Sequence, residues 1–168
     1  MVLRADAELD YHCDGSALRS CITGMNTKSL NEETEKVNSD YSEYLDSAGV
    51  RYLNNQNGFH VYIVFKNIKQ SFTQICYVHK GEILLTDYCG NCYTGVRRAK
   101  QVAKAIGEKF PGYEIRVEQY CASFEIDVYH RIKYTSVEAL HEAVLGVAGV
   151  VDEGARIGRE TLGEDFER

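Results

Sequence analysis

The order in which hydrophobic spacing changes along the chain is the strongest constraint on its fold. Between Phe59 and Val150, apolar residues recur every second residue, then at helical spacing, then every second residue, then at helical spacing again. A period of two indicates a half-buried strand, and spacings of three and four indicate one face of a helix. The resulting order is three strands, one helix, two strands and one helix. Short connections between consecutive strands favour hairpins and antiparallel pairing.

Strands are predicted wherever apolar and polar residues alternate. These segments are residues 59–66, 71–79, 82–88, 113–118 and 124–129. The pair Asn57-Gly58 is a strong turn signal before the first of them. Residues 50–53 are also compatible with a short extended piece. One five-stranded antiparallel sheet is therefore expected.

Helices are predicted in three places. The first has apolar residues at helical spacing from Leu30 to Ala48; it could be capped near Asn26 or Thr27 in a long form, or at Ser39 in a short form. The second runs from Val96 and ends before Pro111. The third begins with Thr135 and Glu138 at capping-box spacing. The prediction is an α+β fold of order α-β-β-β-α-β-β-α, with the helices packed on one face of the sheet.

The length of 168 residues fits one domain with one core. The strand and helix pattern occupies residues 39–151, which are predicted to be that domain. Residues 1–38 contain turn-forming residues and few apolar ones, so they are predicted to be an irregular or partly helical arm. Apolar residues also thin out in residues 152–168, and a frayed helical tail is expected there.

Net charge and hydropathy exclude several classes of partner. The formal net charge of −6 opposes sequence-independent binding of nucleic acid, which depends on Lys and Arg neutralising phosphates. The basic residues Arg97, Arg98, Lys100 and Lys104 are interpreted as a solvated helix face. No stretch has the ~18 consecutive apolar residues of a membrane span, and the N-terminus lacks the apolar core of a signal peptide. A cytoplasmic protein is expected, with no membrane or nucleic-acid partner.

The strongest local chemical motif is Cys89-Gly90-Asn91-Cys92, predicted in the loop between the third strand and the basic helix. Two thiols at this spacing can bind one metal ion or cycle as a dithiol. A zinc site would need about two more ligands, and no second pair has convincing spacing. A helix start nearby favours a reactive thiol, but the strand order is unlike that of thioredoxin-type proteins. Redox, metal-binding and unspecialised thiols all remain open.

No other catalytic signature is present. The chain lacks the GxSxG, GxxxxGK[ST] and HExxH patterns, and its histidines are isolated in sequence. A protein without enzymatic activity and without a cofactor is therefore expected.

The sheet face away from the helices is predicted to be polar and rich in Tyr. Two interpretations are open: a solvated face, which is favoured, and a surface that pairs with a second copy of the chain or with another protein. Tyr and Arg are the side chains that interfaces favour. The candidate binding residues are His60, Tyr62, Arg116, Glu118, Tyr129 and Arg131.

The order of elements from residue 39 to residue 151 resembles the type III secretion chaperone-like fold, including the bacterial YbjN-type group. Residues 44–52 (YLDSAGVRY) look like the opening helix and glycine turn of that group, and residues 99–106 (AKQVAKAI) stand where its middle helix stands. The resemblance implies a non-enzymatic protein-binding module that is commonly dimeric.

Together these observations predict a cytoplasmic protein-binding or chaperone-like module that forms a homodimer and binds an unidentified protein partner. A thiol-redox or metal-binding protein centred on Cys89 and Cys92 is the alternative.

Overall fold

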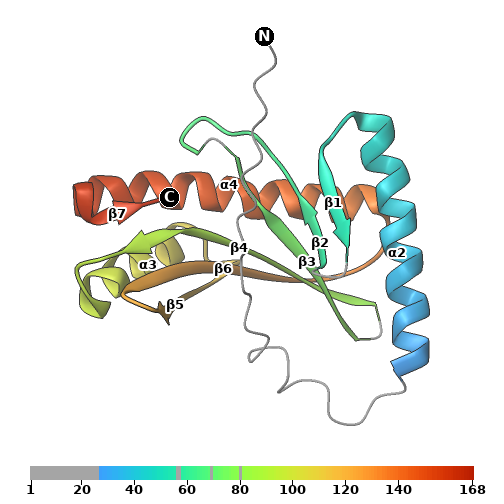
Figure 1. The fold of residues 1–168 in the computed structure, drawn as a ribbon, viewed down its shortest axis with the longest axis horizontal. Coiled ribbons are helices and arrows are strands. Elements are labelled where there is room, and N and C mark those ends of the chain that lie inside the picture. The colour runs from blue at the N-terminus through green and yellow to red at the C-terminus, as the bar shows by residue number, and fades with distance from the viewer. Residues whose placement is uncertain (1–26, 56–57, 69, 80) are drawn as a thin grey trace.

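The computed structural model describes residues 27–55, 58–68, 70–79 and 81–168, so residues 1–26 of the predicted arm lie outside the described residues. The described part is an α+β fold with an antiparallel sheet, as the sequence predicts (Figure 1). Its elements are, in order, α2 (Thr27–Ala48), β1 (Tyr52–Asn55), β2 (Gly58–Val61), β3 (Thr73–His79), β4 (Glu82–Cys92), α3 (Val96–Lys109), β5 (Glu114–Tyr120), β6 (Ser123–Lys133), α4 (Val137–Leu162), the 3-10 helix η1 (Gly163–Asp165) and β7 (Phe166–Glu167).

The sheet has seven strands, so the prediction of five strands in the order α-β-β-β-α-β-β-α is wrong. The strand order is β1-β2-β3-β4-β6-β5, and β7 pairs with the end of β4. The two strands beyond the predicted five are β1, with four residues, which overlaps the short extended piece expected at residues 50–53, and β7, with two. Neither is long enough to show a clear period of two, so alternation alone could not reveal them.

β2 is also shorter than the strand predicted at residues 59–66, since it ends at Val61. Its neighbour β1 is only four residues long, so the sheet offers β2 no longer partner on that side. Beyond Val61 the chain forms a loop, which the Ser71 N–H closes by donating to the Ile63 carbonyl oxygen at 2.7 Å.

Asp152 of α4 anchors this loop. Its carboxylate accepts hydrogen bonds from the backbone N–H of Asn67 at 2.7 Å and of Ile68 at 3.0 Å, and from Asn67 Nδ2 at 2.7 Å. Arg159 of the same helix donates to the Asn67 carbonyl oxygen at 2.8 Å. The buried Asp152 therefore satisfies backbone groups that would otherwise lack partners inside the protein.

The core lies between one face of the sheet and the helices α3 and α4 (Figure 1). The sheet contributes Ile83, Leu85, Ile126 and Val128, all fully buried, and α4 contributes Leu140, Val144, Val147 and Val151. In α3 the buried residues are Ala99, Val102, Ala103 and Ile106, which form an apolar stripe along one face of the helix. In the described ranges no helix combines the length and apolar character needed to cross a membrane.

α2 begins at Thr27, so the helix takes the longer of the two predicted forms. Residues 27–38, the last part of the predicted irregular or partly helical arm, are therefore helical and continuous with the rest of α2. Val37, Tyr41 and Leu45 bury the inner face of α2.

The segment predicted as a frayed tail, residues 152–168, is packed against the domain. α4 continues to Leu162, and β7 then returns along β4. Two glycines of α4 permit this packing: a Cβ at Gly154 would collide with Cys89, and one at Gly158 would collide with Phe166. The sequence interpretation failed because glycines contribute to packing without adding apolar residues to the pattern.

Candidate functional site

The side chains of β5 and β6 that point away from the helices form a compact group. In the strand pairing Arg116 lies opposite Asp127, and Glu118 lies opposite Glu125. Tyr129 is two residues beyond Asp127 on the same face, because successive side chains of a strand alternate between faces. We call the five residues Arg116, Glu118, Glu125, Asp127 and Tyr129 the charged face.

Arg116 and Tyr129 hold each other in place at the centre of the charged face. The Arg116 guanidinium carbon lies 4.3 Å from the centre of the Tyr129 ring, a cation–π contact. The Tyr129 hydroxyl donates to Glu118 Oε1 at 3.2 Å, and Arg116 Nε donates to Glu114 Oε1 at 2.7 Å. Both side chains therefore present an ordered aromatic and cationic surface, the kind that protein interfaces favour.

Carboxylates outnumber cations on the charged face. Burial, followed by the charges of Glu125, Glu118 and Asp87, raises the pKa of Asp127 to about 8, and Arg116 only partly opposes this. Burial and the charge of Glu118 likewise raise the pKa of Glu125. A partner that brings another cation would relieve this crowding of carboxylates.

Arg131 lies beside the charged face, next to a shallow hollow. The hollow has a volume of about 250 Å³ and is lined by Leu84, Gly112, Glu114, Arg116, Tyr129, His130 and Arg131. Arg131 donates to Glu82 at 3.3 Å. Four of the six predicted binding residues, Arg116, Glu118, Tyr129 and Arg131, thus lie together on β5 and β6.

His60 and Tyr62 do not join that group, because β3 and β4 lie between β2 and β6 in the sheet. The His60 ring is half-buried, which lowers its pKa, and its Nδ1 atom has no hydrogen-bond partner in the described part of the chain. Tyr62 lies past the end of β2 and packs edge-on against Phe72, with 5.4 Å between ring centres. The predicted surface is therefore two separate patches.

Tyr88 and Arg168 border the charged face, and the sequence did not indicate either of them. Tyr88 lies opposite Asp127 in the pairing of β4 with β6, and the Arg168 guanidinium carbon lies 4.4 Å from the Tyr88 ring centre. Arg168 also forms a buried ion pair with Asp87 at 3.3 Å. Only the return of β7 along β4 brings Arg168 here, so no local sequence signal could have revealed it.

Asp87 joins this end of the chain to the start of β3. It accepts hydrogen bonds from the backbone N–H of Phe72 at 3.0 Å and from the Thr73 hydroxyl at 3.2 Å. Burial raises the pKa of Asp87, while Arg168 and the hydrogen-bond donors oppose that shift. These hydrogen bonds and the ion pair with Arg168 satisfy the buried Asp87 carboxylate, so its burial needs no ligand.

Cys89 and Cys92 lie in the last part of β4, not in a loop as predicted. β4 continues because a bulge at Gly90, with φ of 148°, shifts its register against β6 and turns both thiols inward. Both residues are 0% exposed, and burial raises the pKa of the Cys89 thiol. The thiolate that metal binding and redox chemistry require is therefore disfavoured at Cys89. Within the described residues no group of three or more His, Cys, Asp or Glu is arranged to hold a metal ion.

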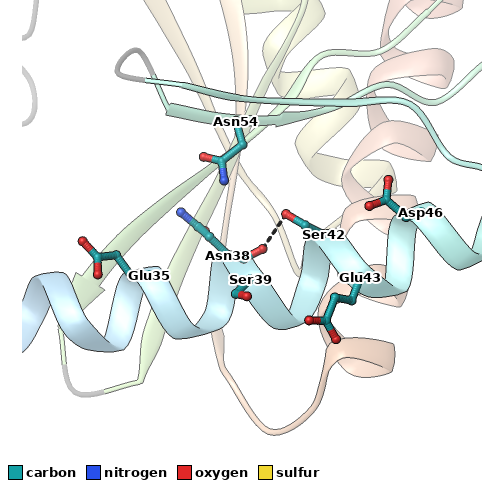
Figure 2. A pocket seen from close by; sticks show the side chains of 7 residues that line it. All are labelled: Glu35, Asn38, Ser39, Ser42, Glu43, Asp46 and Asn54. Carbon is teal, nitrogen blue, oxygen red and sulfur yellow. Dashed lines mark hydrogen bonds between the residues drawn. The ribbon is translucent and has the colours of Figure 1, made fainter.

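A second hollow, of about 400 Å³, lies between α2 and β1. Its lining is polar: Glu35, Asn38, Ser39, Ser42, Glu43, Asp46 and Asn54. In Figure 2, Asn38 of α2 and Asn54 of β1 point toward each other across it, and Ser42 donates to the Asn38 carbonyl oxygen at 2.7 Å. The hollow is open and its side chains are those of a solvated helix surface.

Neither a protein-family model nor a curated protein matches this chain. Among solved structures, YbjN from E. coli, described as a candidate transcription regulator, gives a TM-score of 0.55 at 11% identity, over 72% of this chain and 90% of YbjN. An uncharacterized protein from Methanothermobacter thermautotrophicus gives a TM-score of 0.47 at 12% identity, over 76% of this chain and 99% of that protein. The match to YbjN shows that this chain has a YbjN-type fold. The finer resemblance to type III secretion chaperones stays a prediction.

Proposed function

We propose that this chain is a non-enzymatic, cytoplasmic protein-binding module that acts through the open face of its sheet and also self-associates. The observation that carries the proposal is the charged face, where Arg116 is stacked on Tyr129 at 4.3 Å on a part of the sheet that faces away from α3 and α4. Chaperone-like binding of a partner segment is the specific form of this function that the resemblance favours.

The charge of the open face favours a particular partner. Glu118, Glu125 and Asp127 lie together, and Arg116 is the cation that acts on Asp127. A protein segment that presents Lys or Arg beside an apolar or aromatic residue would complement both the carboxylates and the Tyr129 ring. This partner chemistry is distinct from nucleic acid, which a chain of net charge −6 disfavours.

Affinity capture from the cell of origin tests the proposal. The full chain would be compared with a Tyr129→Ala/Arg131→Ala variant, and the proteins retained would be quantified by mass spectrometry. We expect a basic partner to be recovered with the full chain and reduced about tenfold with the variant, since truncating aromatic and Arg anchors costs about 1–2 kcal/mol of binding free energy or more.

Lys104→Ala on α3 is the matched control, because Lys104 is exposed on a helix that lies on the other side of the sheet. It should leave recovery unchanged. Equal recovery of every retained protein with the full chain and the open-face variant would contradict the proposal.

A further inference from the structure

β5 is a free edge of the sheet. It is last in the strand order, and among the described elements it pairs with β6 and packs against α3. It has seven residues, against four in β1 at the other edge. Unpaired edge strands expose backbone N–H and C=O groups that can pair with another chain, and proteins usually block them with Pro, Lys or bulges. β5 contains neither Pro nor Lys, and its register with β6 is continuous.

The hairpin that joins β5 to β6 determines which backbone groups face this edge. Tyr120 pairs with Ser123 across a two-residue loop, and such a pair can form only when the two residues exchange their own backbone hydrogen bonds. Bonded and non-bonded pairs then alternate along the ladder. The residues whose backbone groups point to the free edge are therefore Ile115, Val117 and Gln119.

The sequence of β5 is complementary to itself about Val117, its central residue. Two antiparallel copies centred there would form a hydrogen-bonded pair of Val117 residues, which matches the outward direction of the Val117 backbone groups. The same register places Arg116 opposite the partner's Glu118, and Glu118 opposite the partner's Arg116. Opposite charges at directly opposed positions stabilise antiparallel strands.

Other registers are poorer. Centring the pair on Arg116 would place it opposite the partner's Arg116, and centring it on Glu118 would place it opposite the partner's Glu118, so both registers oppose like charges. Centring it on Ile115 would pair only part of β5. The register about Val117 aligns the whole strand.

We propose that two copies of this chain join their sheets by antiparallel pairing of β5 with β5 about Val117. The inference deepens the self-association in the proposed function and rests on it. It also supplies a cation to the charged face: the partner's Arg116 would approach Glu118, which lies beside Glu125 and Asp127.

Charge reversal tests the register. Arg116→Glu and Glu118→Arg in the full chain each place like charges opposite one another in a homodimer, so each should weaken dimerisation by about tenfold or more. A 1:1 mixture of the two variants restores opposite charges at both positions. We expect each variant alone to sediment as a monomer at a concentration where the unmodified chain is a dimer, and the mixture to recover the dimer mass.

A second comparison tests the backbone pairing independently of charge. Gln119→Pro removes an N–H from the free edge without removing a bond to β6, so it should weaken the dimer, whereas Gln119→Ala should not. Circular dichroism would establish that each variant is folded. If Gln119→Pro does not fold, the charge-reversal mixture decides the outcome.

A chain that is monomeric throughout the micromolar range would overturn the β5 pairing, as would a dimer that both charge-reversed variants retain. A dimer that resists the β5 variants but is lost on Tyr129→Ala would overturn the β5 pairing and leave the proposed open-face function standing. If the chain captures no partner through the open face but forms a dimer that depends on β5, the β5 pairing stands and the proposed open-face function is overturned.

Discussion

Asp127, on the open face of the sheet, lowers the stability of the folded chain. Its carboxyl group has a pKa of about 8 in the folded chain, against an ordinary value of 3.8, because it is buried next to Glu125 and Glu118. Such a cost in stability is typical of surfaces kept for binding rather than for folding.

The Asp127 pKa predicts a pH dependence with a definite sign. Between about pH 4 and pH 8 the folded chain holds a proton that the unfolded chain has released, so this residue lowers stability progressively as pH rises. Asp127→Asn removes this pH-dependent destabilisation. The free energy of unfolding of the variant, relative to that of the unmodified chain, should therefore increase from pH 4 to pH 8 by about 1 kcal/mol or more. Urea unfolding at several pH values would measure the difference.

Asp165→Asn is the control, because it makes the same carboxyl-to-amide change at an exposed position in η1. A difference between Asp127→Asn and the unmodified chain that is constant across this pH range would show that Asp127 titrates normally.

The two thiols of the CGNC motif give a second prediction at the residue scale. Cys89 and Cys92 are buried, whereas Cys121, in the β5–β6 loop, is exposed. We expect iodoacetamide to modify Cys121 within minutes in the native chain and to leave Cys89 and Cys92 unmodified until the protein unfolds, because the thiolate must form and be accessible. Peptide mapping after brief labelling would measure each site. Rapid native labelling of Cys89 or Cys92 would revive the thiol alternative.

At the scale of elements, the glycines of α4 determine how the C-terminal segment packs. Glycine is intrinsically unfavourable inside a helix, by about 1 kcal/mol relative to Ala, so a helical glycine lowers stability unless a close contact needs the space of its missing side chain. Gly158 has that contact, because the Phe166 ring occupies the space of its missing side chain. Gly149 has none, since nothing lies within 4 Å of the Cβ position.

These two glycines predict opposite effects of the same substitution. Gly158→Ala should destabilise the chain by about 1–3 kcal/mol, because the added methyl group forces Phe166 and β7 away from β4. Gly149→Ala should stabilise it by about 0.5–1 kcal/mol through helix propensity alone. Thermal or urea unfolding of the pair measures both signs. A Gly158→Ala protein as stable as Gly149→Ala would show that β7 is not held by this contact.

At the scale of the whole molecule, stability should fall from the centre of the sheet toward β1. β4 and β6 are eleven-residue strands paired with each other along most of their length and covered by α4, while three of the four residues of β1 are exposed. Hydrogen–deuterium exchange should therefore be slowest in β4, β6 and the middle of α4 and fastest in β1. Equal protection of β1 and β6 would contradict this order.

The sequence by itself determined the elements that have a strong local signal. The strands β3, β5 and β6, the apolar stripe of α3 and the α+β class all follow from spacing within short windows, because alternation and helical periodicity are local consequences of backbone geometry. The same reasoning placed Arg116, Glu118 and Tyr129 on one face of the sheet. These features would be expected in any fold that buries the other face.

Only the tertiary structure decided the features that depend on residues far apart in sequence. The pairing of β7 with β4, the Arg168–Asp87 ion pair and the anchoring of residues 67–68 by Asp152 join positions separated by more than 70 residues. Burial of Cys89 and Cys92 and the separation of His60 from the charged face depend on strand order and on one bulge. Such contacts leave no periodic pattern, because they arise from the closure of the whole chain rather than from the spacing of neighbours.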